Sequence, residues 1–336
     1  MDRLTELERW IAARRPGRDF VLAPASADAS FRRYFRVSFA GAGADSLIAM
    51  DAPPEKEDCR PFVHVAQLLA EAGLNAPRVL EQDLPRGFLL LTDLGTTTYL
   101  EALRAADAAT ADRLFADATD AIVRWQLASR PGALPPYDEA LLRRELALFP
   151  DWYVGRHLGV TLDPAQRDRL ERVFALVVAS NLAQPRVYVH RDYMPRNLMV
   201  CEANPGILDF QDAVHGPIAY DVVCLYKDAF ISWEEERVLD GAVRYWEKAR
   251  RARLPVDADF GAFYRDFEWM GLQRHLKVAG IFARLAHRDG KRAYLEDTPR
   301  FLAYIRAVCR RYDALKPLLE LLDALEGRSA RAGYTF

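Results

Sequence analysis

The sequence predicts an α/β protein of the α+β kind, with a small five-stranded N-terminal lobe and a larger, mainly helical C-terminal lobe. Three observations support this fold class. The chain has 336 residues, which exceeds the usual length of one simple domain. Short β-prone runs separated by Gly, Pro and Asp fill residues 1–94. From residue 95 to residue 336, apolar residues recur mostly at helical spacing, so we expect two lobes with these bounds.

The small lobe is expected to contain an opening helix, five strands and one inserted helix. The opening helix covers about residues 4–14. The strands are expected at residues 20–22, 34–39, 47–50, 77–80 and 88–92. The inserted helix covers about residues 60–72, because Phe62 and Leu69 belong to an apolar set at helical spacing and Gly73 ends the pattern.

The large lobe is expected to consist of helices interrupted by short β runs. Helical periodicity is present at residues 98–107, 109–129, 137–149, 164–180, 260–286 and 300–325, with further helical segments near residues 219 and 235. Asp163 followed by Pro164 is a typical helix start, because an N-cap oxygen precedes a proline at the first position. The β runs are residues 187–189 and 198–201, with residues 207–208 beside the second. Strand-borne loops next to helices are typical of an enzyme with a cleft.

The composition excludes several classes of protein. Lys plus Arg total 46 against 48 for Asp plus Glu, which argues against a nucleic-acid binder and against a polybasic membrane anchor. No run approaches the ~20 apolar residues of a membrane span. The charged N-terminus is not a signal peptide, and the four cysteines lie far apart without metal-binding spacing. We therefore expect a cytoplasmic monomer that binds neither nucleic acid nor membrane.

Residues suited to phosphoryl transfer concentrate in one segment of the second half. A β run leads into HRD at residues 190–192, Asn197 follows, and another β run ends in DFQ at residues 209–211. Phosphoryl transfer needs a carboxylate that orients or deprotonates the attacking hydroxyl, and hard oxygen ligands for Mg²⁺ on the nucleotide phosphates. Asp192 fits the first role. The Asn197 amide and the Asp209 carboxylate fit the second.

This segment resembles the catalytic segment of a known family. HRDYMPRN fits the kinase pattern H-R-D-x-x-x-x-N letter for letter, and DFQ stands where protein kinases carry DFG. Over nearly its full length the chain resembles the aminoglycoside-phosphotransferase-like small-molecule kinases, which implies a bilobal protein-kinase-like fold. The stretches DASFRRYFRV, MDAPPEKEDCRPF, GFLLLTDLG and DFQDAVHGPIAYDVVCL are most similar to anomeric kinases of bacterial cell-wall recycling. The resemblance implies ATP- and Mg²⁺-dependent phosphorylation of N-acetylmuramate or N-acetylglucosamine at the 1-hydroxyl, feeding UDP-sugar synthesis.

The resemblance also implies roles for individual residues. Asp192 is the expected catalytic base, Asn197 and Asp209 hold Mg²⁺, and His190 supports the loop. Asp221 is expected to be a structural anchor or an ordinary first-turn carboxylate of the following helix. The expected nucleotide contacts come from the first β-turn and the junction of the lobes: Ser26, Ser30, Arg33, Leu91, Thr92 and Leu94.

One feature of this family is missing from the small lobe. The third strand reads SLIAM and carries no lysine for the phosphates, and Lys56 is the only lysine of the lobe. We expect Arg33 to replace it, because strand alternation puts Arg33 on the apolar face of Phe35, which would cover the nucleotide. Lys56 is the rival. Arg32 and Arg36 are further candidates, with a solvated side chain as the default expectation for both.

The acceptor pocket is expected after the metal loop, which is the DFQ segment at residues 209–211, and on the helix at residues 260–286. The candidates are Gln211, His215, Lys227, Arg274 and Lys277. N-acetylmuramate carries a carboxylate, which a cation should meet. Alternatives are a kinase for another small alcohol (an aminoglycoside, choline or homoserine) and a nucleotide-binding pseudokinase scaffold. Candidate cations favour a neutral or anionic acceptor over a polycationic aminoglycoside. The filled catalytic positions argue against the scaffold, and the short span between DFQ and Asp221 favours a small-molecule acceptor over a protein.

Overall fold

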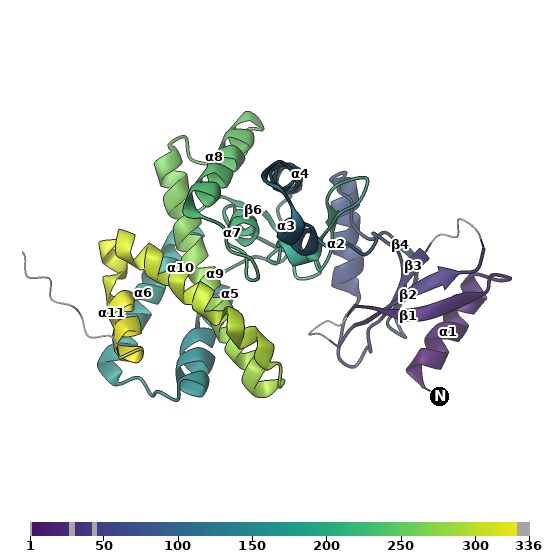
Figure 1. Cartoon of the computed structure of the whole chain (residues 1–336), viewed down its shortest axis with the longest axis horizontal. Coiled ribbons are helices and arrows are strands. Elements are labelled where there is room, and N and C mark those ends of the chain that lie inside the picture. Colours follow the sequence, from purple (N-terminus) through teal and green to yellow (C-terminus); the bar gives the residue numbers. More distant parts are fainter. Residues whose placement is uncertain (1, 27–30, 42–45, 328–336) are drawn as a thin grey trace, which may run out of the picture. The chain divides into compact units, whose positions relative to one another are not determined.

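The computed structural model describes residues 2–26, 31–41 and 46–327. The chain forms two compact units, coloured along the sequence in Figure 1. The first unit comprises residues 1–128 and 195–213, and the second comprises residues 129–194 and 214–336. Each unit therefore draws on separated segments of the chain. The expected lobe boundary after residue 94 stays a prediction.

The first unit is built on a five-stranded antiparallel sheet with the strand order β1-β2-β3-β5-β4. Its strands are β1 (Phe20–Ser26), β2 (Arg33–Phe39), β3 (Ser46–Asp51), β4 (Val79–Asp83) and β5 (Phe88–Thr92). Each of the five expected strands is present. This sheet, followed by a mainly helical remainder, confirms the predicted fold class.

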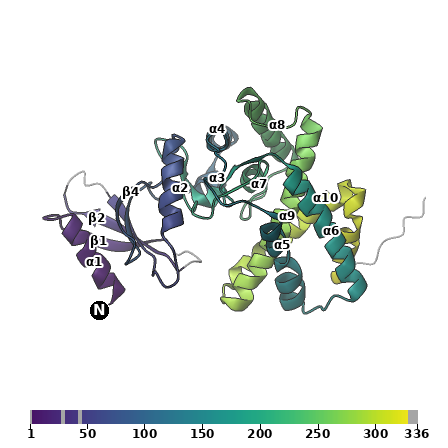
Figure 2. The ribbon, with the colours of Figure 1, turned by 180° about the vertical axis from the view of Figure 1, so that it is seen from behind.

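Helix α1 (Arg3–Arg14) lies along the sheet in both ribbon views (Figures 1 and 2). The two elements share one buried core: Leu7, Trp10, Ile11, Val37, Phe39, Ala49, Phe88 and Leu90. Because side chains alternate along β2, Arg33 and Phe35 belong to the same face as Val37. The expectation that this face covers a nucleotide is therefore wrong, since α1 occupies it.

The rest of the first unit carries the DFQ segment. Helix α2 (Arg60–Glu71) contacts it through Phe62, whose ring centroid lies 4.7 Å from that of Phe210. A short hairpin of β7 (Leu198–Met199) and β8 (Gly206–Ile207) precedes this segment, and a 3₁₀ turn (Pro195–Asn197) precedes the hairpin. Helices α3 (Tyr99–Ala105) and α4 (Ala108–Leu127) complete the unit.

The second unit is organised around α9 (Phe260–Arg288), whose residues from Phe267 to Gly280 are buried throughout. The buried stretch includes charged as well as apolar side chains, and its Arg274 and Lys277 are each bonded to a partner inside the core. Helix α9 packs against a π-helical segment (Phe149–His157) and against the helices α5 (Glu139–Leu146), α6 (Pro164–Ala183), α7 (Tyr220–Tyr226), α8 (Glu235–Arg251) and α10 (Thr298–Arg311). Figure 2 shows α9 among α5, α6 and α10.

Two details of the second unit differ from the sequence expectation. Strand β6 (Arg186–Val189) pairs with β9 (Val214–Pro217), which was not predicted because it is short and contains Gly and Pro. The expected helix at residues 300–325 is divided, with α10 ending before Tyr312 and α11 (Lys316–Leu325) following. Pro317 explains the break, because its ring would clash with the carbonyl of Asp313 in a continuous helix. Within the described residues, no helix is long and apolar enough to cross a membrane.

Candidate active site

In the second unit, Asp221 holds the turn that precedes Asp192. Asp221 lies in the first turn of α7 and is fully buried. Its Oδ2 accepts a hydrogen bond from the His190 amide at 2.8 Å, and its Oδ1 accepts one from the Arg191 amide at 3.0 Å. Burial raises the pKa of Asp221 to about 7, against the lowering effect of these two amides. This carboxyl group therefore fixes two successive peptide groups.

His190 and Arg191 make further contacts that hold the same turn. The His190 ring is buried, and its Nδ1 accepts a hydrogen bond from the Asp192 amide at 3.3 Å. Arg191 adopts a positive φ of 76°, which is uncommon for a residue with a side chain. Its carbonyl accepts a bond from the Cys224 thiol at 3.3 Å, and its side chain braces the loop through Glu145. The path of the chain into Asp192 is thus fixed at each step.

In the first unit, Asn197 and Asp209 lie side by side. Asn197 Nδ2 is 3.4 Å from Asp209 Oδ2, because the Leu208 amide donates to the Asn197 carbonyl at 2.9 Å and joins the two segments. Gln211 Nε2 donates to Asp209 Oδ1 at 2.8 Å. Asp209 has a φ of 60°. The Asp209 carboxylate lies beside two side-chain amides, each of which can turn its oxygen or its nitrogen towards a partner. The oxygens of these three groups are hard donors that fit Mg²⁺.

The expected nucleotide contacts all belong to the first unit. Ser26 ends β1 opposite Tyr34, whereas Ser30 lies outside the described residues. Leu91 is buried in β5 opposite Ile48 of β3. Thr92 ends β5, and its hydroxyl accepts a bond from the Arg78 amide at 2.9 Å. Leu94 follows Asp93, which binds Arg36, Ser46 and the amide of Gly95.

The basic residues of the small lobe differ in their surroundings. Arg33 binds the buried carboxylate of Asp51, to which Arg3 of α1 also binds. The Lys56 ammonium lies 4.6 Å from the centroid of the Phe31 ring. Arg36 was expected to be solvated, but its Nε donates to Asp93 at 2.6 Å.

Arg32 is half-buried, although the sequence favoured a solvated side chain. Burial lowers the pKa of Arg32, but the attraction of nearby Tyr34, Glu57, Asp209 and Asp212 outweighs it and raises that pKa. Arg32 is therefore a small-lobe cation that experiences the negative charge of the DFQ segment.

The candidates for acceptor binding fall in different places. Gln211 lies beside Asp209 in the first unit. His215 lies on β9, where its amide donates to the Pro135 carbonyl at 2.8 Å. Arg274 is buried in α9 and donates to the Lys227 carbonyl at 3.0 Å. Burial lowers the pKa of the Lys227 ammonium to about 8, against the attraction of Glu268. Lys277 is also buried in α9 and is bound by Glu145.

Glu145 is a residue that sequence reasoning missed. It lies on α5 within the apolar stripe formed by Leu142, Leu146 and Phe149. A charged residue in the phase of an apolar stripe was the available signal, because such a residue is buried only when it is paired. Glu145 binds both Arg191 and Lys277, so it connects the HRD segment at residues 190–192 to α9.

Comparisons with known proteins identify the family of the chain. Residues 21–256 match the model of the phosphotransferase enzyme family. A relative from Pseudomonas aeruginosa is 58% identical over 304 residues, which cover 90% of this chain and 88% of the relative. A relative from Neisseria meningitidis is 50% identical and is covered over 100% of both chains. Both relatives are named N-acetylmuramate/N-acetylglucosamine kinase.

Solved structures share the fold at low sequence identity. The GDP complex of an aminoglycoside 2′-phosphotransferase mutant has a TM-score of 0.63 and 14% identity, covering 90% of this chain and 98% of that one. A Plasmodium vivax ethanolamine kinase has a TM-score of 0.60 and 10% identity, covering 87% and 82%. The family match covers most of the chain, and the identities to the relatives are high over nearly its whole length. The chain therefore belongs to the phosphotransferase enzyme family and is a phosphotransferase.

Proposed function

We propose that this enzyme transfers the γ-phosphoryl group of ATP to the anomeric 1-hydroxyl of N-acetylmuramate and N-acetylglucosamine. The observation that carries the proposal is the near-complete match, at 50% identity or more, to relatives named as kinases of these two sugars. The product would be a sugar 1-phosphate, the substrate class that nucleotidyl transfer consumes. We propose accordingly that the enzyme is a cytoplasmic monomer and acts in peptidoglycan recycling.

Asp192 would perform the proton chemistry of this reaction. Its carboxylate would accept a hydrogen bond from the sugar hydroxyl, orient the oxygen towards phosphorus and receive the proton as the P–O bond forms. Asp192 lies at the end of a fixed turn. The amides of His190 and Arg191 donate to the Asp221 carboxylate, and the amide of Asp192 donates to the His190 ring. Orientation of this kind supports the assignment, because a carboxylate on a loosely held loop would lose most of the benefit.

Asn197 and Asp209 would hold Mg²⁺ in the first unit. The ion would neutralise charge on the nucleotide phosphates. Asp209 would supply the charged ligand and Asn197 an amide oxygen. Gln211, bonded to Asp209 at 2.8 Å, would keep that carboxylate in place.

Arg32 would supply the positive charge that the missing strand lysine cannot supply. Arg33 is directed to the α1 face by strand alternation and is bound by Asp51, whereas Arg32 interacts with Asp209 and Asp212. A guanidinium beside the metal loop can make charge-assisted bonds to phosphate oxygens. The remaining nucleotide contacts would come from Ser26, Leu91, Thr92 and Leu94.

The test is an ATP-consumption assay with a panel of acceptors. N-acetylmuramate, N-acetylglucosamine, an aminoglycoside, choline and homoserine would each be supplied with ATP and Mg²⁺. We expect turnover with the two sugars, and phosphorus–proton coupling at the anomeric carbon in the NMR spectrum of each product. Turnover with choline or an aminoglycoside alone, or phosphate on another hydroxyl, would contradict the proposal.

A further inference from the structure

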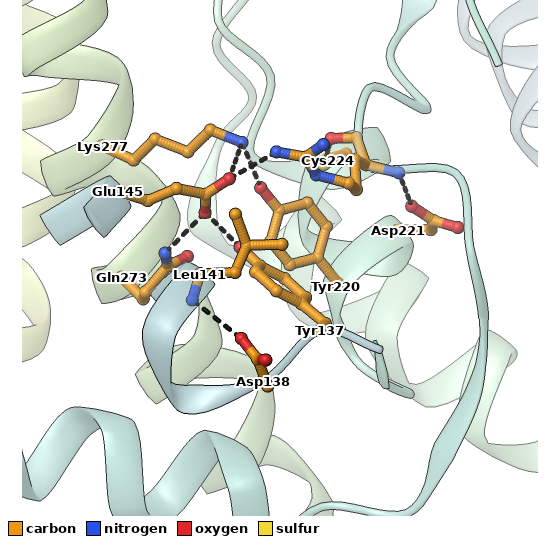
Figure 3. A network of polar contacts seen from close by, with 10 residues as sticks. Tyr137, Asp138, Leu141, Glu145, Tyr220, Asp221, Cys224, Gln273 and Lys277 are labelled. Carbon is orange, nitrogen blue, oxygen red and sulfur yellow. Dashed lines mark hydrogen bonds and ion pairs between the residues drawn. The ribbon is translucent and has the colours of Figure 1, made fainter. Parts of the chain in front are cut away.

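Three charged side chains meet inside the second unit and form what we call the ion triad, Lys277, Glu145 and Arg191. Figure 3 shows Lys277 and Glu145 directed towards each other. Glu145 comes from α5, Lys277 from α9, and Arg191 from the loop after β6. Glu145 Oε1 lies 2.5 Å from Arg191 Nη2 and 3.0 Å from Lys277 Nζ. The exposed fraction of the side chain is 6% for Glu145 and 8% for Lys277. Glu145 and Lys277 are therefore shielded from water, while Arg191 keeps 17% of its side chain exposed.

Neutral groups complete the bonding of the triad. Glu145 Oε2 accepts from the hydroxyl of Tyr137 and from Gln273 Nε2, the latter at 2.9 Å. Lys277 Nζ donates to the Tyr220 hydroxyl at 3.1 Å. Burial alone would raise the pKa of Glu145, but Lys277 and Arg191 outweigh it and lower that pKa to about 2. The carboxylate is thus charged and bonded at both oxygens.

Arg191 joins the triad to the catalytic loop, because it is itself a residue of that loop. Arg191 directly precedes Asp192 and occupies the left-handed region with a φ of 76°. A residue with a side chain remains there only where its surroundings hold it. The Asp221 carboxylate holds its amide, the Cys224 thiol its carbonyl and Glu145 its guanidinium. Of these three partners, only Glu145 binds the side chain of Arg191.

We propose that Glu145 and Lys277 are positioning residues, which act through Arg191 to hold Asp192 in its working orientation for either sugar. The inference rests on the proposed function and goes beyond it, because it removes Lys277 from the residues that recognise the acceptor. Lys277 keeps Glu145 in place, and Glu145 keeps Arg191 in place. The role of the triad is the same whether the acceptor carries a carboxylate or not.

Direct recognition of an acceptor carboxylate by Lys277 is the competing role. Its ammonium already contacts Glu145 and the Tyr220 hydroxyl. To bind a substrate carboxylate it would have to leave Glu145 with one cation fewer inside the protein. Breaking a buried ion pair by removing one partner is strongly destabilising, whereas a solvent-facing cation could bind the substrate without that loss. The geometry therefore favours positioning.

The two sugars separate these roles, because only N-acetylmuramate carries a carboxylate. Lys277→Met and Glu145→Gln would be compared with wild type in steady-state kinetics on each sugar. We expect kcat to fall about 100-fold for both sugars, the scale of an ~1 Å misplacement, with KM for both sugars little changed. Lys277→Arg and Glu145→Asp, which keep the charges, should recover part of kcat. A rise in KM for N-acetylmuramate alone would overturn the proposal.

A matched control separates positioning from general loss of a buried cation. Arg306 on α10 is as buried as Lys277, with 7% of its side chain exposed, and pairs with Asp323 and Glu326. Arg306→Met should lower the melting temperature without the fall in kcat; an equal fall in kcat would count against positioning. If wild type turns over neither sugar, the proposed function fails. Positioning is then read from Asp192-dependent ATP hydrolysis, which Lys277→Met should slow and Arg306→Met should not.

Discussion

Arg32 and Arg33 are adjacent in the sequence, yet their surroundings assign them to different tasks. Arg33 binds Asp51, and Arg32 interacts with Asp209 and Asp212. Arg32→Ala should raise KM for ATP by about 10-fold to 100-fold, since a hydrogen bond to a charged group contributes roughly 1.5–3 kcal/mol. Arg33→Ala, the neighbouring control, should lower stability and leave KM for ATP unchanged. Kinetics at saturating sugar measure both, and a larger effect of Arg33→Ala on KM would refute the assignment.

Sequence analysis predicted those candidate site residues that belong to a motif with fixed spacing. Asp192, Asn197 and Asp209 belong to a pattern that can be read without a structure, and their roles remain proposals. Arg33 shows the limit of this reasoning: strand alternation gave the residues that share its face, but not which face α1 would cover. Glu145 was missed because its two cationic partners lie 46 and 132 residues away in the sequence.

At the scale of elements, one aromatic contact fixes the DFQ segment to α2. The Phe62 and Phe210 rings lie 4.7 Å apart, and both side chains are buried. Phe62→Ala should lower the free energy of unfolding by about 3–5 kcal/mol. Combined with Phe210→Ala in a double-mutant cycle, it should show a coupling of about 0.5–1.5 kcal/mol.

Trp10 provides the control for this cycle. Its ring contacts Phe88 on the α1 face of the sheet, with the centroids 5.8 Å apart. The control cycle combines Trp10→Ala with Phe62→Ala. These two side chains belong to different contacts, so their effects on the free energy of unfolding should add. Urea unfolding of the four variants in each cycle gives the coupling, and equal coupling in the two cycles would show that Phe62 has no specific connection to Phe210.

Local pattern predicted most elements, because strands and helices differ in the period of their apolar residues. The five strands of the sheet and the long α9 were found in this way. The pairing of β9 with β6 was not, since a four-residue strand containing Gly216 and Pro217 has no readable period. The break at Tyr312 could have been predicted from Pro317. It was missed because the apolar pattern continues across the break.

At the scale of the whole molecule, the sequence did not predict that each compact unit is discontinuous. Residues 195–213 belong with residues 1–128, so Asp192 is in one unit and Asn197 and Asp209 are in the other. Contacts between distant segments decide this division, and local periodicity carries no information about them. Catalysis and nucleotide binding should therefore be separable by mutation.

MgATP should stabilise the wild-type protein against heat, because a ligand that binds only the folded state raises its stability. Asp209→Ala should abolish most of this rise in melting temperature, since it removes the charged metal ligand. Asn197→Ala should reduce it less, because an amide contributes a dipole and no charge. Asp192→Asn should keep the full rise while kcat falls about 10²–10⁴-fold, the scale of general base catalysis. Thermal unfolding with ATP, with and without Mg²⁺, measures all three variants. An unchanged rise in Asp209→Ala, or a lost rise in Asp192→Asn, would show that the roles of these two carboxylates are assigned wrongly.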